Sequence, residues 1–119
     1  MKYLQFSRRI FSAIVVVYAL SLSTAQAADG DAFKGRSFYA VCAGCHGADA
    51  MGSEATNAPR LQGQFDWYLI RQLKNYQSGA RGVHKDDSYG ATMRAMAGTL
   101  ANEQAILDVV AYIGTLKSK

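Results

Sequence analysis

The residues best suited to chemistry are two cysteines and a histidine in the segment Cys42-Ala43-Gly44-Cys45-His46. Two thiols three positions apart can add to the two vinyl groups along one edge of a haem, and the histidine that follows can reach the iron. The pattern C-x-x-C-H is the signature of such covalent attachment. It predicts one covalently bound haem c, attached at Cys42 and Cys45, with His46 as an axial ligand.

Two other roles for paired cysteines fit the sequence less well. A structural zinc ion needs four ligands, whereas the chain has two cysteines and two histidines, and His84 lies 38 residues from His46. A redox-active dithiol is expected after a strand in a βαβ unit, and no such pattern flanks Cys42. A plain disulfide would leave His46 without a role, so haem attachment is the favoured interpretation.

The second axial ligand would decide what the haem does. A five-coordinate iron is open to small molecules, whereas a second protein ligand closes it and favours electron transfer. The downstream candidates are His84, Met93 and Met96, while Met51 is too near the motif to reach across the ring. The two methionines follow a glycine-rich loop and lie in a segment expected to be extended. The residue types alone leave all three candidates open.

The rest of the chain is predicted to be all-α. Apolar residues recur at helical spacing in three segments, residues 31–41, 66–78 and 102–116, and residues 78–90 are predicted to form a loop. Suitable N-caps are Asp29 or Asp31, Asp66, and Asn102 or Thr99. Gly35 lies inside the first helix, where glycine costs up to about 1 kcal/mol relative to alanine, so another backbone is expected to approach it closely.

The first 27 residues have the pattern of a secretory signal peptide. Lys2, Arg8 and Arg9 precede an uncharged apolar run, residues 10–22, and Ala25-Gln26-Ala27 forms an A-x-A cleavage site. We expect cleavage after Ala27 and export to the periplasm. An uncleaved membrane anchor is the alternative, although the run is short for a membrane span. The domains are therefore predicted as signal peptide, 1–27, and haem domain, 28–119.

The mature chain would be small and nearly neutral. Residues 28–119 contain 10 of the 13 lysines and arginines and all nine aspartates and glutamates, which gives a net charge of +1 before the haem propionates are added. No basic stripe indicates nucleic-acid binding. A chain of this size has a modest core of its own, so we expect the haem to supply part of the core and the haem-free chain to fold poorly.

Four segments resemble the class I cytochromes c. They are C-A-G-C-H-G, A-P-R-L-Q-G-Q with the W-Y-L-I-R-Q-L that follows, M-R-A-M-A-G-T-L and D-V-V-A-Y-I, and together they span most of the mature chain. The chain is most similar to small bacterial single-haem domains that also occur in duplicate in two-haem periplasmic cytochromes. The resemblance implies a small cytochrome c fold of three to four helices wrapped around one covalently attached haem.

The resemblance also implies roles for particular residues. It assigns the second axial position to Met93 rather than Met96, and it makes the carbonyl of Pro59 the partner of the His46 ring. It further implies that Gly35 and Tyr39 meet Val109 and Tyr112 where the first and last helices cross. The chain departs from the family at Ala101, where a serine or threonine cap is usual, and this places the start of the last helix in question.

These features predict an electron-transfer protein rather than an enzyme. With His46 and Met93 as ligands, the haem would shuttle electrons between periplasmic or membrane redox partners, including transient contacts with respiratory complexes. Two alternatives stay open. The chain could be a haem subunit of a larger dehydrogenase, held through an apolar patch around Phe65, Trp67 and Tyr68, or an open-iron protein that binds small ligands.

Overall fold

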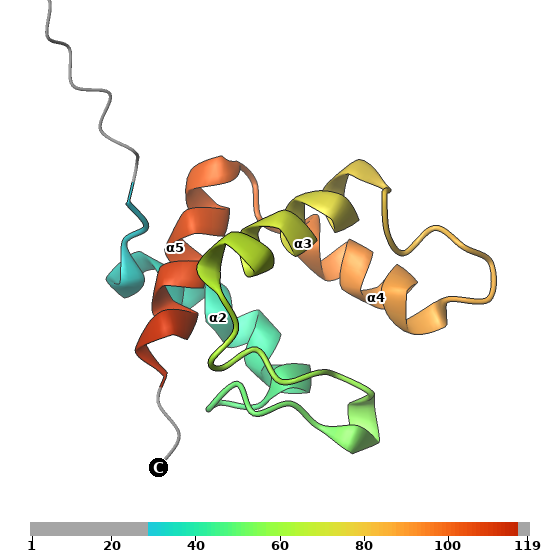
Figure 1. Cartoon of the computed structure of the whole chain (residues 1–119), viewed down its shortest axis with the longest axis horizontal. Helices are drawn as coiled ribbons and strands as arrows, with labels where there is room; N and C mark the ends of the chain where they lie inside the picture. Colours follow the sequence, from blue (N-terminus) through green and yellow to red (C-terminus); the bar gives the residue numbers. More distant parts are fainter. Residues whose placement is uncertain (1–28, 117–119) are drawn as a thin grey trace, which may run out of the picture.

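The fold is given by a computed structural model, which describes residues 29–116. It contains four α-helices and one short 3₁₀ helix (Figure 1), which are α2 (Ala32–His46), η2 (Glu54–Thr56), α3 (Asp66–Ser78), α4 (Ser88–Ala97) and α5 (Glu103–Thr115). Between residues 29 and 116 the only extended pairing is an isolated bridge between Ser53 and Ala58. The predicted all-α class and the predicted number of helices are confirmed. The predicted signal peptide, residues 1–27, lies outside the described residues.

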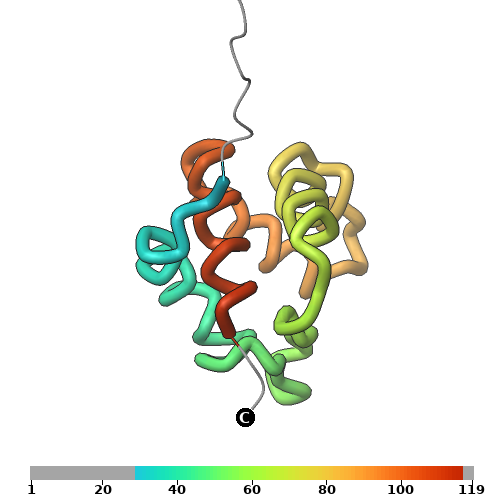
Figure 2. The backbone as a smooth tube through the Cα atoms, turned by 60° about the vertical axis from the view of Figure 1, so that its left-hand side comes forward, coloured from blue at the N-terminus to red at the C-terminus, as the bar shows by residue number. Residues whose placement is uncertain are grey.

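The first and last helices cross on one side of the molecule, and α3 and α4 lie on the other (Figure 2). At the crossing, a Cβ atom added to Gly35 would lie 1.9 Å from the carbonyl oxygen of Asp108 and 3.0 Å from the Cβ of Tyr112. The rings of Tyr39 and Tyr112 pack with centroids 5.4 Å apart. The close approach expected at Gly35 is therefore present, and its nearest contact is the backbone of Asp108 rather than Val109.

The hydrophobic core is centred on α5. Its apolar face is almost inaccessible to water, with exposed fractions of 1% at Ile106 and Val109 and 4% at Ile113. Around it pack Leu69 from α3 and Leu100 from the segment between α4 and α5. The apolar period predicted for the last helix thus forms the centre of the fold, and the other helices are held in place through it.

Three helix starts test the predicted caps. Asp31 caps α2, since its carboxylate accepts hydrogen bonds from the backbone N–H groups of Phe33 and Lys34. Asn102 caps α5 by accepting from the N–H of Ala105 at 2.9 Å, which resolves the question raised by Ala101. The prediction for α3 was wrong by one position, because the cap residue is Phe65 and the helix begins at Asp66.

The largest departure from the sequence prediction is α4. Its ten residues are mostly small or polar and show little apolar period, so the methionine segment was wrongly expected to be extended and residues 88–90 to be loop. The helix is fixed by local and tertiary contacts instead. Asp87 caps it by accepting from the N–H of Gly90 at 2.7 Å. A Cβ at Gly82, where φ is +73°, would lie 2.2 Å from the Gly90 carbonyl oxygen, so the preceding loop packs directly on this helix.

Two further details bear on the site. Helix α2 was expected to end at residue 41 but continues through His46, and Gly47 with φ +83° ends it. Trp67, at the start of α3, has an exposed fraction of 58%. None of the helices in residues 29–116 is long and apolar enough to span a membrane.

Candidate haem site

The three residues of the C-x-x-C-H motif lie in the last turns of α2. Cys42, Cys45 and His46 occupy positions i, i+3 and i+4, which share one face of an α-helix. The longer helix is therefore what brings both thiols and the imidazole to the same side. A flat ligand lying along this face can meet two sulfur atoms at its edge and a nitrogen atom on its plane.

The ring of His46 is held by the carbonyl of Pro59. The two atoms Nδ1 and O are 2.8 Å apart, and the side chain of His46 is buried, with an exposed fraction of 6%. Because a carbonyl oxygen can only accept, this hydrogen bond requires the proton on Nδ1 and leaves the lone pair on Nε2. An imidazole oriented in this way through its other nitrogen is prepared to bind a metal.

The loop that carries Pro59 is fixed by backbone and side-chain hydrogen bonds. The carbonyl of Ala50, which is fully buried, accepts from the N–H groups of Leu61 and Gln62 at 2.9 and 3.1 Å. The amide of Gln62, exposed by only 4%, donates to the carbonyl of Asp49 at 3.2 Å. These contacts close the segment after the motif into a loop that returns Pro59 to His46.

The carbonyls at the end of α2 are also satisfied. Tyr39 donates to the carbonyl of Gly47 at 2.7 Å, Thr56 to that of Cys45 at 2.9 Å, and the N–H of Gly52 to that of His46 at 2.8 Å. Burial, followed by smaller effects of nearby charges, raises the pKa of Tyr39 to about 12, so its hydroxyl stays a donor at ordinary pH. These three carbonyls at the end of the helix that carries the motif therefore all have hydrogen-bond donors.

The two thiols are free and differ in environment. Cys42 is half-buried and Cys45 is exposed, and they form no disulfide with each other. Burial raises the pKa of the Cys42 thiol, and the neighbouring Cys45 adds to the effect. Two unpaired thiols and an oriented imidazole on one helix face fit the donor set that covalent haem attachment requires.

Met93 lies on the inward face of α4. It shares that face with Gly90 and Ala97, at i−3 and i+4, both of which are buried, and it is itself half-buried. Met96 is more exposed, at 38%, as is Met51, at 41%. The side chain of His84 is 73% exposed in the loop before α4.

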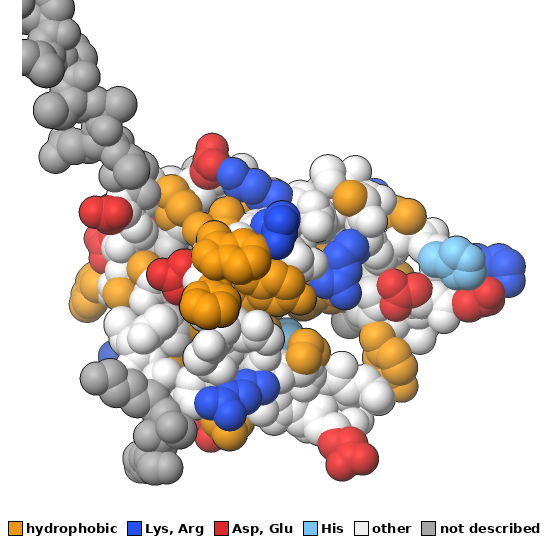
Figure 3. Space-filling model, in the orientation of Figure 1, with side chains coloured by type: hydrophobic (Ala, Val, Ile, Leu, Met, Phe, Trp, Pro, Cys, Tyr) orange, Lys and Arg blue, Asp and Glu red, His pale blue; other side chains and the backbone are white. Residues whose placement is uncertain are grey.

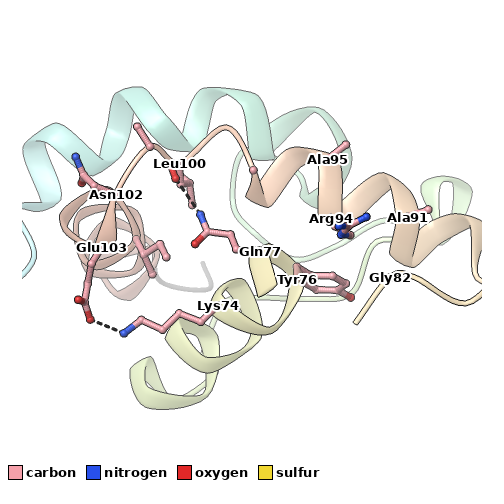
Figure 4. A pocket seen from close by; sticks show the side chains of 13 residues that line it. Lys74, Tyr76, Gln77, Gly82, Ala91, Arg94, Ala95, Leu100, Asn102 and Glu103 are labelled. Carbon is pink, nitrogen blue, oxygen red and sulfur yellow. Dashed lines mark hydrogen bonds and ion pairs between the residues drawn. The ribbon is translucent and has the colours of Figure 1, made fainter. Parts of the chain in front are cut away.

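A separate groove of about 600 Å³ lies between α3, α4 and the start of α5 (Figure 4). Helix α4 lines it with Ala91, Arg94 and Ala95, which occupy the face opposite Met93. The groove includes none of the motif residues. Because its α4 residues lie opposite Met93, the groove is on a different side of α4 from the methionine.

The fold and this site define an all-α protein that attaches haem through cysteine. The sequence model of the family described as "Cytochrome c" matches residues 32–117, and the chain belongs to the cytochrome c family. Membership of this family, together with the single C-x-x-C-H motif, gives the chain one covalent haem c.

Three curated relatives illustrate the similarity. The chain is 35% identical to cytochrome c4 of Pseudomonas aeruginosa over 106 residues, 87% of this chain and 47% of that protein. It is 42% identical to "Thiosulfate dehydrogenase electron acceptor" of Stutzerimonas stutzeri over 100 residues, 80% of this chain and 42% of that protein. It is 35% identical to cytochrome c-554(547) of Halothiobacillus neapolitanus over 92 residues, 74% and 99% of the two chains. The chain thus spans about half the length of the first two relatives.

For some residues that build the site, no sequence pattern indicates a structural role. Thr56 and Gln62 each make one hydrogen bond that fixes the haem loop, and neither belongs to a pattern that indicates such a role. Gln77 joins α3 to the end of α4, because its amide donates to the carbonyls of Ala97 and Leu100. Signals of this kind are absent from a sequence because each depends on a partner at a distant position.

Proposed function

We propose that this chain is a one-electron carrier, with haem c attached at Cys42 and Cys45 and with His46 and Met93 as axial ligands. When bound, the haem supplies a reversible change between ferric and ferrous iron. The polypeptide supplies the ligands of the iron, excludes water from the haem and transforms no substrate. The observation that carries the proposal is the 2.8 Å contact between His46 Nδ1 and the Pro59 carbonyl, since it orients the imidazole and leaves Nε2 free to bind iron.

The choice of Met93 over Met96 rests on the faces of α4. Met93 shares the buried side of the helix with Gly90 and Ala97, whereas Met96 lies toward solvent. A thioether on the second side of the iron closes it to small molecules and raises the reduction potential relative to a second histidine. His84 is a poorer candidate because it sits on an exposed loop and accepts a hydrogen bond from the N–H of Asp86.

The proposal extends to location and partners. We propose that residues 1–27 direct export, that cleavage follows Ala27 and that the protein works in the periplasm. Its partners would be redox proteins, among them membrane respiratory complexes, met in brief contacts of small area. The similarity to a protein named as the electron acceptor of thiosulfate dehydrogenase supports a role as acceptor for a dehydrogenase.

One observation favours the alternative of a haem subunit within a larger dehydrogenase. Phe65 and Trp67 have exposed fractions of 71% and 58%, as that alternative predicts, although Tyr68 is half-buried. Co-purification of the exported protein with a second polypeptide at fixed ratio would support this alternative. Isolation of the haem-loaded chain free of other proteins would favour the mobile carrier.

The central test is the visible spectrum of the exported, haem-loaded protein, oxidised and reduced, compared with Met93→Ala and the matched control Met96→Ala. We expect a low-spin spectrum with a weak sulfur-to-iron band that disappears in Met93→Ala and persists in Met96→Ala. A high-spin oxidised spectrum in the parent protein would reject the carrier in favour of an open iron. Loss of the band in Met96→Ala alone would reassign the ligand.

A further inference from the structure

The start of α3 carries three aromatic side chains and an arginine, here called the aromatic patch: Phe65, Trp67 and Arg71 are exposed and Tyr68 is half-buried. The rings of Phe65 and Trp67 stack with centroids 5.9 Å apart and planes inclined by 17°. Tyr68 meets Trp67 edge-on at 6.0 Å, and the Arg71 guanidinium lies 4.7 Å above the Trp67 ring. Figure 3 shows hydrophobic side chains gathered over this part of α3.

The patch is ordered and faces outward. The carbonyl of Phe65 accepts from the N–H groups of Tyr68 and Leu69 at 2.9 and 3.1 Å, and Leu69 is buried in the core. Trp67 and Arg71 lie at i and i+4, on the face of α3 opposite Leu69. Side chains held in place before contact lose little freedom when they bind, and tryptophan, tyrosine and arginine are enriched at the centres of protein interfaces.

The charges around the patch are of both signs. Asp66 is exposed on one side of Trp67, close to Gly114 at the end of α5. Arg71 lies over the ring of Trp67. In Figure 3 acidic side chains border the hydrophobic group on one side and basic side chains on the other. A partner of uniformly acidic or basic surface would meet one repulsive charge here.

This arrangement of opposite charges on the two sides of the patch is complementary to the same patch on a second copy of the chain. In a dimer with two-fold symmetry the same patch is used twice, so that Arg71 of one copy can face Asp66 of the other while the aromatic rings meet at the axis. We propose that the aromatic patch is the contact surface of a homodimer. The proposal is independent of which residues ligate the iron, and it assigns to α3 a role beyond covering the core.

The test is the mass of the haem-loaded, exported protein in sedimentation equilibrium over a wide range of concentration. We expect a reversible monomer–dimer equilibrium. Trp67→Ser should raise the dimer dissociation constant at least about tenfold, as for a central tryptophan of an interface. The matched control is Phe33→Ser, because Phe33 is an aromatic residue exposed by 88% on α2, outside the patch, and this variant should leave the constant unchanged.

Charge exchange tests the geometry and does not depend on removing an aromatic ring. Asp66→Lys or Arg71→Glu alone should weaken the dimer by placing like charges opposite each other, and the two changes together should restore it. A monomer at every concentration, including one that instead binds a different protein, would overturn the proposal. A dimer that is as tight in Trp67→Ser and in both charge variants would also overturn it.

Discussion

The carboxylate of Asp108 lies 2.7 Å from the backbone nitrogen of Asp31, across 77 residues of sequence. It also accepts from the side-chain amide of Gln104 at 2.8 Å, and Asp108 is buried with an exposed fraction of 3%. The middle of α5 is thereby bonded to the start of α2. The carboxylate is kept in its charged form because both neighbours donate hydrogen bonds to it.

This arrangement predicts a pH-dependent contribution to stability. The hydrogen bond from Asp31, then that from Gln104, lowers the pKa of Asp108 from its ordinary value of 3.8. The stabilisation is therefore complete at a pH above the pKa that Asp108 has in the unfolded chain. It is lost as the pH falls through the lower pKa that Asp108 has in the folded protein. We expect Asp108→Asn to lower the free energy of unfolding by about 1–3 kcal/mol at neutral pH.

The measurement is denaturant unfolding of the haem-loaded protein from neutral to acidic pH. The difference in free energy of unfolding between the parent and Asp108→Asn should shrink as the pH falls below 4. A difference that stays constant with pH would contradict a role for the charge of Asp108.

The contact between Gly35 and Asp108 predicts that a single methyl group is not tolerated. A Cβ atom at Gly35 would lie 1.9 Å from the Asp108 carbonyl oxygen, so Gly35→Ala must push α2 away from α5. We expect Gly35→Ala to lower the free energy of unfolding by about 1–3 kcal/mol or more, which is measured as a lower thermal midpoint. Gly44→Ala in the same helix is the control, because a Cβ there meets nothing within 4 Å and should leave stability equal or slightly higher.

Gln77 is expected to affect how firmly Met93, the proposed ligand, is held. Its amide nitrogen donates to the carbonyls of Ala97 and Leu100, each at 2.9 Å, and so joins α3 to the end of α4 (Figure 4). If Met93 is the ligand, as proposed, Gln77→Ala should weaken this attachment by about 1–2 kcal/mol and lower the denaturant concentration at which the sulfur-to-iron band is lost.

The readout for Gln77→Ala is the loss of the sulfur-to-iron band as denaturant is added. Gln64→Ala is the matched control, since Gln64 makes one exposed hydrogen bond, to the carbonyl of Arg60. An unchanged midpoint in Gln77→Ala would show that the packing of α4, and not this amide, holds Met93.

The ion pair between Lys74 and Glu103 is expected to matter little. The hydrogen bond and charge of Lys74 lower the pKa of Glu103, but the two side chains are 47% and 67% exposed. Solvent screening leaves such pairs weak. Glu103→Gln should shift the denaturation midpoint much less than Asp108→Asn does, and a shift of equal size in the same experiment would argue against this view.

The sequence was sufficient wherever the signal is local. C-x-x-C-H identified the haem chemistry because attachment needs two thiols and an imidazole at fixed spacing, and the apolar period of α5 identified the core helix. The expected contact of the His46 ring with Pro59 is present in the structure at 2.8 Å. Met93 as a ligand and residues 1–27 as a signal peptide stay predictions.

The tertiary structure decided what local patterns could not. Helix α4 has little apolar period of its own and is fixed by a cap at Asp87 and by the packing of Gly82 on Gly90. Trp67 has the residue type of a core side chain, yet its position on the outer face of α3 exposes it. In both cases the outcome depends on which distant segments pack nearby, because burial and backbone contact are properties of the folded chain and not of a short stretch of sequence.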